Sequence, residues 1–156
     1  MSGQYLTFRL AEDDYAFGIM RVKEILEYDT VTRVPNAPPA IRGVINLRGA
    51  VVPVVDLAIR FDLPPTAVTR WTCIVIVEVR SGEEDLVMGV LADGVTEVIN
   101  LAPDAIEPPP SFGAKVRVEY LVGLGKIDSR FVLILDVDRL LGRTELPQPA
   151  LEAAAG

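Results

Sequence analysis

The sequence contains no histidine and only one cysteine. Without histidine, the chain has no imidazole for acid–base catalysis at neutral pH and no histidine ligand for a metal. The single cysteine, Cys73, permits no internal disulfide, and its place in the apolar run 72–75 is typical of a small buried hydrophobic residue. Catalysis by histidine and redox chemistry by paired cysteines are therefore excluded.

The chain also has few positive charges and no long hydrophobic run. It carries 15 lysine and arginine residues against 22 aspartate and glutamate residues, a net charge of -7, and the basic residues are scattered singly. This argues against nucleic acid as a partner, because neutralising a row of phosphates needs clustered cations. The longest apolar runs end well before the roughly 20 residues of a membrane-spanning helix, so we expect no direct membrane insertion. The start of the sequence has no secretion signal, which predicts a cytoplasmic protein.

The composition that remains is that of a well-packed globular domain. Half of the 156 residues are hydrophobic and 24% are charged, whereas a disordered chain combines low hydrophobicity with high net charge. The length suits one domain, or two small units that share a core.

The hydrophobic pattern mostly has the two-residue period of β-strands, which predicts an all-β fold. The run 15–28 also has apolar spacing that suits a helix, but its β-branched residues favour one long, bent strand. Arg48 and Gly49 form a predicted tight turn, in which glycine supplies the positive φ. The other predicted strands are 5–10, 44–47, 51–55, 72–80, 86–91, 120–127 and 131–135, and the predicted helical turns are 57–61 and 137–141.

The two halves of the sequence resemble each other. Residues 43–56 align with residues 123–136 without a gap, and the segment 22–25 aligns with 95–98. Such self-similarity indicates a tandem pair of related β units. Because each unit alone would have only a marginal core, we expect the two to pack on a shared hydrophobic core.

Carboxylates at the ends of predicted strands are the main candidates for catalysis: Asp56, Asp93, Asp128 and Asp136. A small hydrolase or ligand-binding barrel could use such groups in pairs. Capping explains Asp56 and Asp136 more simply, because each precedes a possible helix, and turn formation explains the other two. The sequence shows neither a phosphate-binding loop nor a metal-ligand spacing. We therefore predict no enzyme activity, no catalytic residue, no metal and no cofactor.

The segment 40–57, AIRGVINLRGAVVPVVDL, closely resembles the signature stretch of CheW-type chemotaxis coupling proteins. The resemblance extends over nearly the whole chain through VKEI at 22–25, VTRV at 31–34, GVLADGV at 89–95 and EYLVGLG at 119–125. It implies two similar SH3-like five-stranded β-barrel subdomains on a shared hydrophobic core, with short helical turns and no catalytic activity.

We accordingly expect a single CheW-like domain over residues 3–142. Its approximate subdomains are 15–66 and 70–137, with the terminal segments packing across them. The segment 143–156 lacks a core-facing pattern and is expected to be a flexible tail.

The resemblance also implies partners. Members of this family bind the regulatory domain of the CheA-type histidine kinase and the cytoplasmic tip of methyl-accepting chemoreceptors, which places the chain in receptor arrays beneath the inner membrane. Matched by motif, receptor contact would involve Val22, Glu24 and Arg48, and a neighbouring groove between the subdomains would be lined by Cys73, Gly89, Val95 and Val98. Kinase contact would involve Phe112, and Glu107 stands where some members carry a basic residue.

Taken without the resemblance, most of these positions have a simpler structural explanation. The three valines fit core positions, and Glu24 and Arg48 fit a solvated surface pair. Arg48 is the exception, because an arginine at a hairpin tip has little packing role and its planar fork suits a partner's carboxylate or carbonyl groups. The expected function is a non-enzymatic adaptor that couples chemoreceptors to a CheA-type kinase. An adaptor of a non-flagellar pathway, controlling pili or biofilm, is the alternative.

Overall fold

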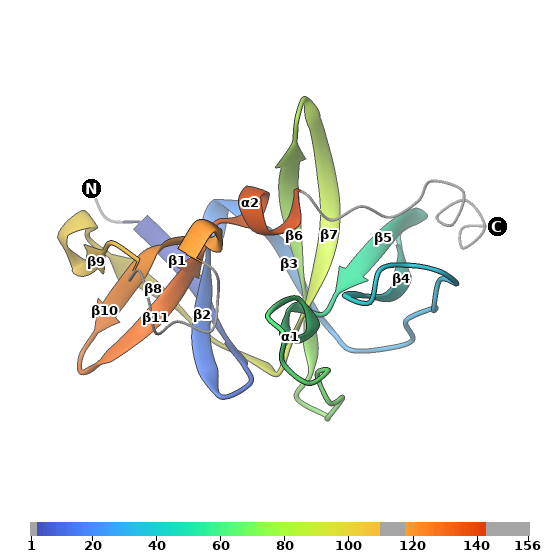
Figure 1. Ribbon diagram of the computed structural model, residues 1–156, viewed down its shortest axis with the longest axis horizontal. Helices are drawn as coiled ribbons and strands as arrows, with labels where there is room; N and C mark the ends of the chain where they lie inside the picture. Colours follow the sequence, from blue (N-terminus) through green and yellow to red (C-terminus); the bar gives the residue numbers. More distant parts are fainter. Residues whose placement is uncertain (1–2, 110–117, 143–156) are drawn as a thin grey trace.

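Two β-sheets form the protein, in a computed structural model that describes residues 3–109 and 118–142. Sheet A has six strands in the order β8-β1-β2-β11-β10-β9, and sheet B has five in the order β3-β6-β7-β5-β4 (Figure 1). Neighbouring strands are antiparallel except for two parallel pairs, β2 with β11 and β5 with β7.

The strands of sheet A are β1 (Gly3–Leu10), β2 (Asp13–Gly18), β8 (Gly94–Leu101), β9 (Ile106–Glu107), β10 (Leu121–Ile127) and β11 (Arg130–Leu135). The strands of sheet B are β3 (Val22–Glu27), β4 (Ile41–Leu47), β5 (Ala50–Val55), β6 (Cys73–Ser81) and β7 (Glu84–Ala92). The helices are α1 (Leu57–Arg60) and α2 (Val137–Leu141), and the 3-10 turns are η1 (Ile19–Arg21), η2 (Pro103–Ala105) and η3 (Val118–Tyr120).

The all-β prediction is confirmed, together with the predicted hairpins and both short helices. Sheet A has one strand more than the five expected, because the two-residue strand β9 pairs with β10 at its edge. The predicted tail at 143–156 and the predicted contact residue Phe112 lie outside the described residues.

The prediction of one continuous strand over 15–28 is wrong. That stretch consists of β2, η1 and β3, and the two strands belong to different sheets. Strand β2 pairs with β1 and β3 pairs with β6, so no single ladder could hold both. The chain changes sheets at η1, where Met20 is 88% exposed.

The internal repeat appears in the strand order of the two sheets. The sequence β3-β6-β7-β5-β4 in sheet B corresponds to β8-β1-β2-β11-β10 in sheet A. The aligned glycines Gly43 and Gly123 both lie at a shift of strand register. A Cβ atom at Gly123 would approach the carbonyl oxygen of Glu107 to 2.6 Å, and one at Gly43 would collide with the carbonyl of Thr32. Only glycine fits where another backbone segment comes this close.

The two sheets draw on different parts of the chain. Sheet B is built from one continuous stretch, 22–92, while sheet A takes residues 3–18 and 94–135. The strands of sheet A therefore come from both ends of the chain, and the residues of sheet B lie between them in the sequence. The single domain over 3–142, with its approximate subdomains 15–66 and 70–137, stays a prediction.

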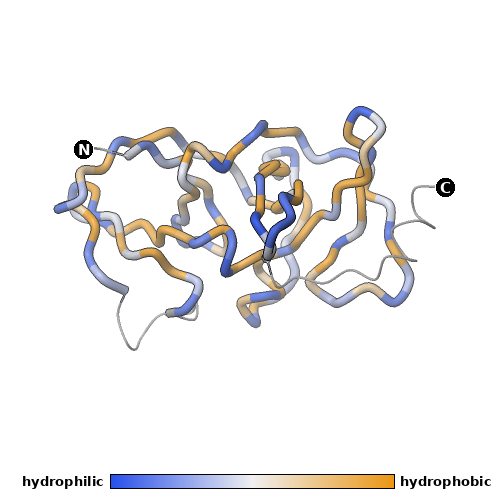
Figure 2. The backbone as a smooth tube through the Cα atoms, turned by 90° about the horizontal axis from the view of Figure 1, so that it is seen from above, coloured by the Kyte–Doolittle hydropathy of each residue, from blue (hydrophilic) through white to orange (hydrophobic). Residues whose placement is uncertain are grey.

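One hydrophobic core joins the two sheets. Its fully buried members include Phe8 and Phe17 from sheet A, Val75 and Val77 from sheet B, and Leu140 from α2. Two smaller clusters lie within single sheets, one around Ile76 and one around Ile134. Hydrophobic and hydrophilic stretches alternate along the chain, and several of the outer turns are hydrophilic (Figure 2).

Candidate interaction surface

Arg48 occupies the tip of the β4–β5 hairpin. The turn has only two residues between the paired ends Leu47 and Ala50, and both have positive φ, 51° at Arg48 and 90° at Gly49. This is the type of two-residue turn that matches the twist of a hairpin. Asn46 stabilises it, since its side-chain oxygen accepts a hydrogen bond of 2.8 Å from the Gly49 amide. The turn projects Arg48 outward, and its side chain is 71% exposed.

Glu24 meets Arg48 from the opposite edge of sheet B. One carboxylate oxygen of Glu24 accepts from Nη1 of Arg48 at 3.2 Å, and the other accepts from Nη2, which makes the pair bidentate. The hydrogen bond from Arg48 lowers the pKa of Glu24, and the same bond raises the pKa of Arg48. The predicted surface pair therefore exists as a charged, solvent-accessible centre that offers both a carboxylate and a guanidinium edge.

The other predicted contact residues lie at different depths. Val22 and Val95 are half-buried and pack against the core shared by the sheets, and Cys73 belongs to that core. Val98, in contrast, is 48% exposed on the edge strand β8 of sheet A. Val22 and Glu24 both lie on β3, whereas Val95 and Val98 both lie on β8, the strand that corresponds to β3 in the repeat.

Gly89 is buried between β6 and β5, so its part in any surface is indirect. A Cβ atom there would come within 2.7 Å of Ile74 Cγ2 and 3.5 Å of Val54 Cγ2. Burial raises the pKa of the Cys73 thiol, a condition that disfavours the reactive thiolate. Both residues therefore belong to the interior of the protein and are not exposed contact residues.

Three of the four predicted strand-end carboxylates accept structural hydrogen bonds. Both oxygens of the buried Asp56 accept hydrogen bonds, from Ala58 N, Thr66 N, Thr66 Oγ1 and Arg42 Nη1. Asp136 caps α2 through the Arg139 amide, and Asp93 accepts from the amide of Ala11 at 2.9 Å. Asp128 lies in a turn with φ of 51°. The chemistry of these groups is that of caps and turns.

Within residues 3–109 and 118–142, no group of three or more side chains is placed to hold a metal ion, and no helix is long and apolar enough to cross a membrane. An open pocket of about 440 Å³ is lined by Tyr28, Val31, Arg33, Pro39, Ile41 and Arg42, none of which belongs to the predicted contact set.

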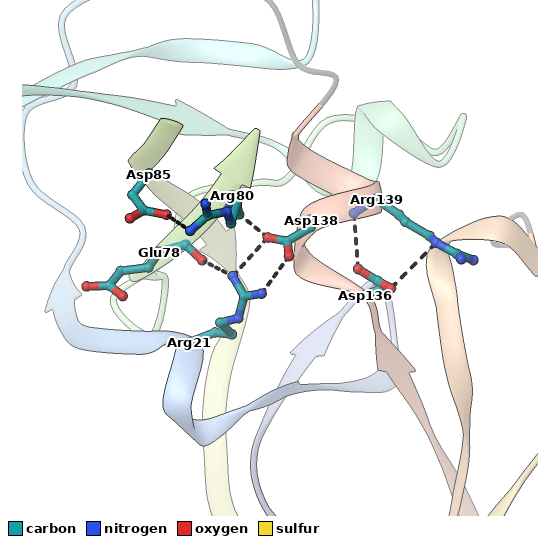
Figure 3. A network of polar contacts seen from close by, with 7 residues as sticks. All are labelled: Arg21, Glu78, Arg80, Asp85, Asp136, Asp138 and Arg139. Carbon is teal, nitrogen blue, oxygen red and sulfur yellow. Dashed lines mark hydrogen bonds and ion pairs between the residues drawn. The ribbon is translucent and has the colours of Figure 1, made fainter. Parts of the chain in front are cut away.

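Sequence reasoning missed a polar network between the sheets. It contains Arg21 at the end of η1, Glu78 and Arg80 on β6, and Asp138 on α2 (Figure 3). Arg21 directly precedes Val22, the first residue of β3. The periodicity of the sequence carries no signal for a contact between residues 117 positions apart.

Comparisons with known proteins agree with this architecture. Residues 4–145 match the CheW-like domain family. The chain is 36% identical over 143 residues to the chemotaxis protein CheW of Klebsiella aerogenes, covering 92% of this chain and 84% of that protein. It is 35% identical to the Bacillus subtilis chemotaxis protein CheW, covering 88% and 86%. The crystal structure of the scaffolding protein TtCheW from Thermoanaerobacter tengcongensis superposes with a TM-score of 0.80 at 31% identity, covering 92% of both chains.

Proposed function

Since this chain belongs to the CheW-like domain family, we propose that it joins the cytoplasmic tips of methyl-accepting chemoreceptors to the regulatory domain of a CheA-type histidine kinase. Its function is that of a non-enzymatic scaffold in chemotaxis signalling. The observation that carries this conclusion is the agreement with a scaffolding protein over 92% of both chains. Its place is the cytoplasm, at receptor arrays beneath the inner membrane.

The receptor surface proposed here centres on the Arg48–Glu24 pair. Three properties support it: the Arg48 side chain is exposed, a defined hairpin turn holds it, and its bidentate pair with Glu24 brings a guanidinium and a carboxylate together. Val22, Val95 and Val98 supply apolar surface on β3 and β8. Cys73 belongs to the core against which Val22 and Val95 pack, and Gly89 keeps the interior of sheet B tightly packed beside Ile74 and Val54.

The kinase contact is proposed for sheet A. Glu107 is exposed on β9, the short strand at the edge of that sheet, five residues before Phe112. An acidic residue at this edge would favour a basic patch on the kinase domain, because complementary charges steer and orient an encounter.

Co-sedimentation tests the proposal. The full chain is mixed with a receptor cytoplasmic fragment, with a CheA-type kinase from the same genome, or with both. We expect the kinase to sediment with the receptor fragment only when the chain is present. Failure of the chain to bind either partner, in a folded state verified by circular dichroism, would refute the proposed function.

A matched pair of variants tests the receptor surface. Arg48→Ala should reduce sedimentation with the receptor fragment, while Arg139→Ala, which removes an arginine of similar exposure (67%) from α2, should leave it unchanged. Equal effects of the two variants would show that loss of surface charge, and not the hairpin tip, weakens the complex.

A further inference from the structure

Arg21 is hydrogen-bonded to two different parts of the molecule at the point where the chain passes from sheet A to sheet B. Its Nη1 and Nη2 atoms donate to the two carboxylate oxygens of Asp138, at 2.8 and 2.5 Å. Nη1 also donates to the backbone carbonyl of Glu78 at 3.1 Å. Asp138 lies on α2, which follows the last strand of sheet A, and Glu78 lies on β6 of sheet B (Figure 3).

Asp138 is itself attached to β6. Its Oδ1 atom accepts a hydrogen bond of 2.7 Å from the backbone amide of Arg80. The end of α2 is attached to the same strand, because Ser81 Oγ donates to the carbonyl of Gly142 at 2.8 Å. Helix α2 is therefore held along β6 by two polar contacts in addition to its buried leucines.

These contacts lie next to an irregular stretch of β3. The β3–β6 ladder shifts register between Val22 and Glu24, so the backbone hydrogen bonds are interrupted where β3 begins. A bulge of this kind bends the strand and leaves a residue unpaired. Arg21 precedes the bulge and is bonded to Glu78 O and, through Asp138, to the Arg80 amide. Arg21 thus attaches the start of β3 to β6 at the place where the backbone ladder has the fewest hydrogen bonds.

The network favours the charged forms of both side chains. Burial alone would raise the pKa of Asp138, but the hydrogen bonds from Arg21 and the Arg80 amide, with the nearby positive charges, together lower it. The hydrogen bond to Asp138 raises the pKa of Arg21. The link is therefore an ion pair throughout the neutral pH range.

We propose that Asp138 is a positioning residue for the receptor-contact strand. By holding Arg21 against β6 it fixes the start of β3, and with it the orientation of Val22 and Glu24. A change in the position of α2 is thereby transmitted to the surface that a receptor fragment contacts, although α2 contains none of the proposed contact residues. The inference rests on the proposed function only for the identity of that partner.

Hydrogen exchange of the free protein tests the structural half of the inference. In Asp138→Asn the oxygen that replaces Oδ1 can still accept from the Arg80 amide, but the amide nitrogen that replaces Oδ2 faces the Nη2 donor of Arg21, and the negative charge that pairs with Arg21 is gone. We expect faster exchange in β3 and unchanged exchange in β10 and β11. Asp85→Asn is the matched control, since Asp85 pairs with Arg80 in the same network but does not touch Arg21, and it should leave β3 unchanged. Faster exchange throughout the molecule, or none in β3, would overturn the proposal.

Titration with a receptor cytoplasmic fragment tests the functional half. We expect Asp138→Asn and Arg21→Gln each to weaken binding about threefold to tenfold, which is within the range for residues that act on a site without touching the ligand. The double variant should be no weaker than either single variant, because all three lack the same link. Asp138→Glu, which keeps the carboxylate, should recover part of the affinity. Additive losses, or equal weakening by Asp85→Asn, would overturn the proposal.

The two readouts separate this inference from the proposed function. If the unaltered protein does not bind the receptor fragment, the proposed function fails, and the exchange rates of β3 still decide whether Asp138 positions that strand. If binding occurs and Arg48→Ala abolishes it while Asp138→Asn has no effect, the function stands and the positioning role is wrong. Arg21→Gln provides the same tests should Asp138→Asn fail to fold.

Discussion

The ion pair between Arg48 and Glu24 links the β4–β5 hairpin tip to β3, the strand at the opposite edge of sheet B. The related half of the molecule has a similar contact, in which Arg130 Nη2 donates to Glu97 at 3.4 Å. Glu97 is the repeat equivalent of Glu24, but Arg130 stands two positions beyond the equivalent of Arg48. In both sheets an arginine of the hairpin therefore pairs with a glutamate of the edge strand. The two arginines occupy different positions relative to the turn.

We predict that Arg48→Ala and Glu24→Ala weaken binding to a receptor fragment while the melting temperature stays nearly constant. The fold should tolerate Arg48→Ala, because alanine and arginine are about equally disfavoured at the positive φ of position 48, and Gly49 is unchanged. Binding should fall about 30-fold or more, as for loss of a hydrogen-bonded charge that an interface buries. Titration calorimetry measures the first effect and differential scanning calorimetry the second. Unchanged affinity in both variants would show that the proposed receptor surface lies elsewhere.

We also predict one cooperative unfolding transition for the described domain. Residues from both sheets and from α2 share a single core, so neither sheet can lose its packing without exposing the other. The calorimetric and van't Hoff enthalpies should agree, and circular dichroism should follow the same curve as the fluorescence of Trp71. Two well-separated transitions would mean that the stretch 22–92 folds independently of the strands around it.

Tyr15 provides a test at high pH. It is fully buried, its hydroxyl has no hydrogen-bond partner among the described residues, and burial, reinforced by the charge of Asp13, raises its pKa to about 12. An unfolded tyrosine ionises near pH 10, so the unfolded state loses a proton before the folded state does. Stability should therefore decline between pH 10 and about 12, by up to about 2.7 kcal/mol from this residue.

Tyr15→Phe should remove the part of the stability loss at high pH that the ionisation of Tyr15 causes. At pH 7 it should leave stability unchanged or raise it by about 1 kcal/mol, because an unpaired buried hydroxyl is unfavourable. Urea denaturation from pH 7 to 11.5 gives both values, and the ultraviolet titration of the unaltered protein should contain a component near pH 12 that Tyr15→Phe lacks. A clear loss of stability at pH 7 would indicate that the hydroxyl has a favourable contact.

The local pattern of the sequence predicted most of the fold. Alternation and turn residues identify the hairpins, and the aligned stretches 43–56 and 123–136 indicate two related units, because both are properties of neighbouring residues. The division of the run 15–28 at Ile19–Arg21 escaped prediction, since it depends on which sheet offers hydrogen-bond partners to each part. The same holds for sheet A, whose strands come from both ends of the sequence.

The candidate surface was predictable only in part. The resemblance to a family identified Arg48 and Glu24, and the turn sequence explains why Arg48 projects outward. That the two side chains pair with each other follows from the approach of two sheet edges, which no periodicity reveals. The link between Arg21 and Asp138 was missed for the same reason, because each residue taken alone resembles an ordinary surface charge.

Asp56 and Asp136 occupy aligned positions in the two halves but differ in burial and in hydrogen-bond partners. Both precede a short helix and cap it, and the amide of each donates to a carbonyl of the preceding segment, at 2.7 Å to Ala40 and 2.8 Å to Tyr120. Asp56 is fully buried and also binds Thr66 and Arg42, whereas the side chain of Asp136 is 33% exposed and pairs with Arg139 of its own helix.

We therefore predict that the same substitution has very different effects at the two positions. Asp56→Asn should lower the free energy of unfolding by about 3 to 5 kcal/mol, because it leaves the charge of Arg42 uncompensated and turns an amide NH₂ toward donors that need an acceptor. Asp136→Asn should change it by less than about 0.5 kcal/mol, since asparagine caps a helix as well as aspartate does. Urea denaturation with a common slope measures both. Similar small losses would mean that the contacts of Asp56 contribute little to stability, and its carboxylate would again become a candidate for a role other than structure.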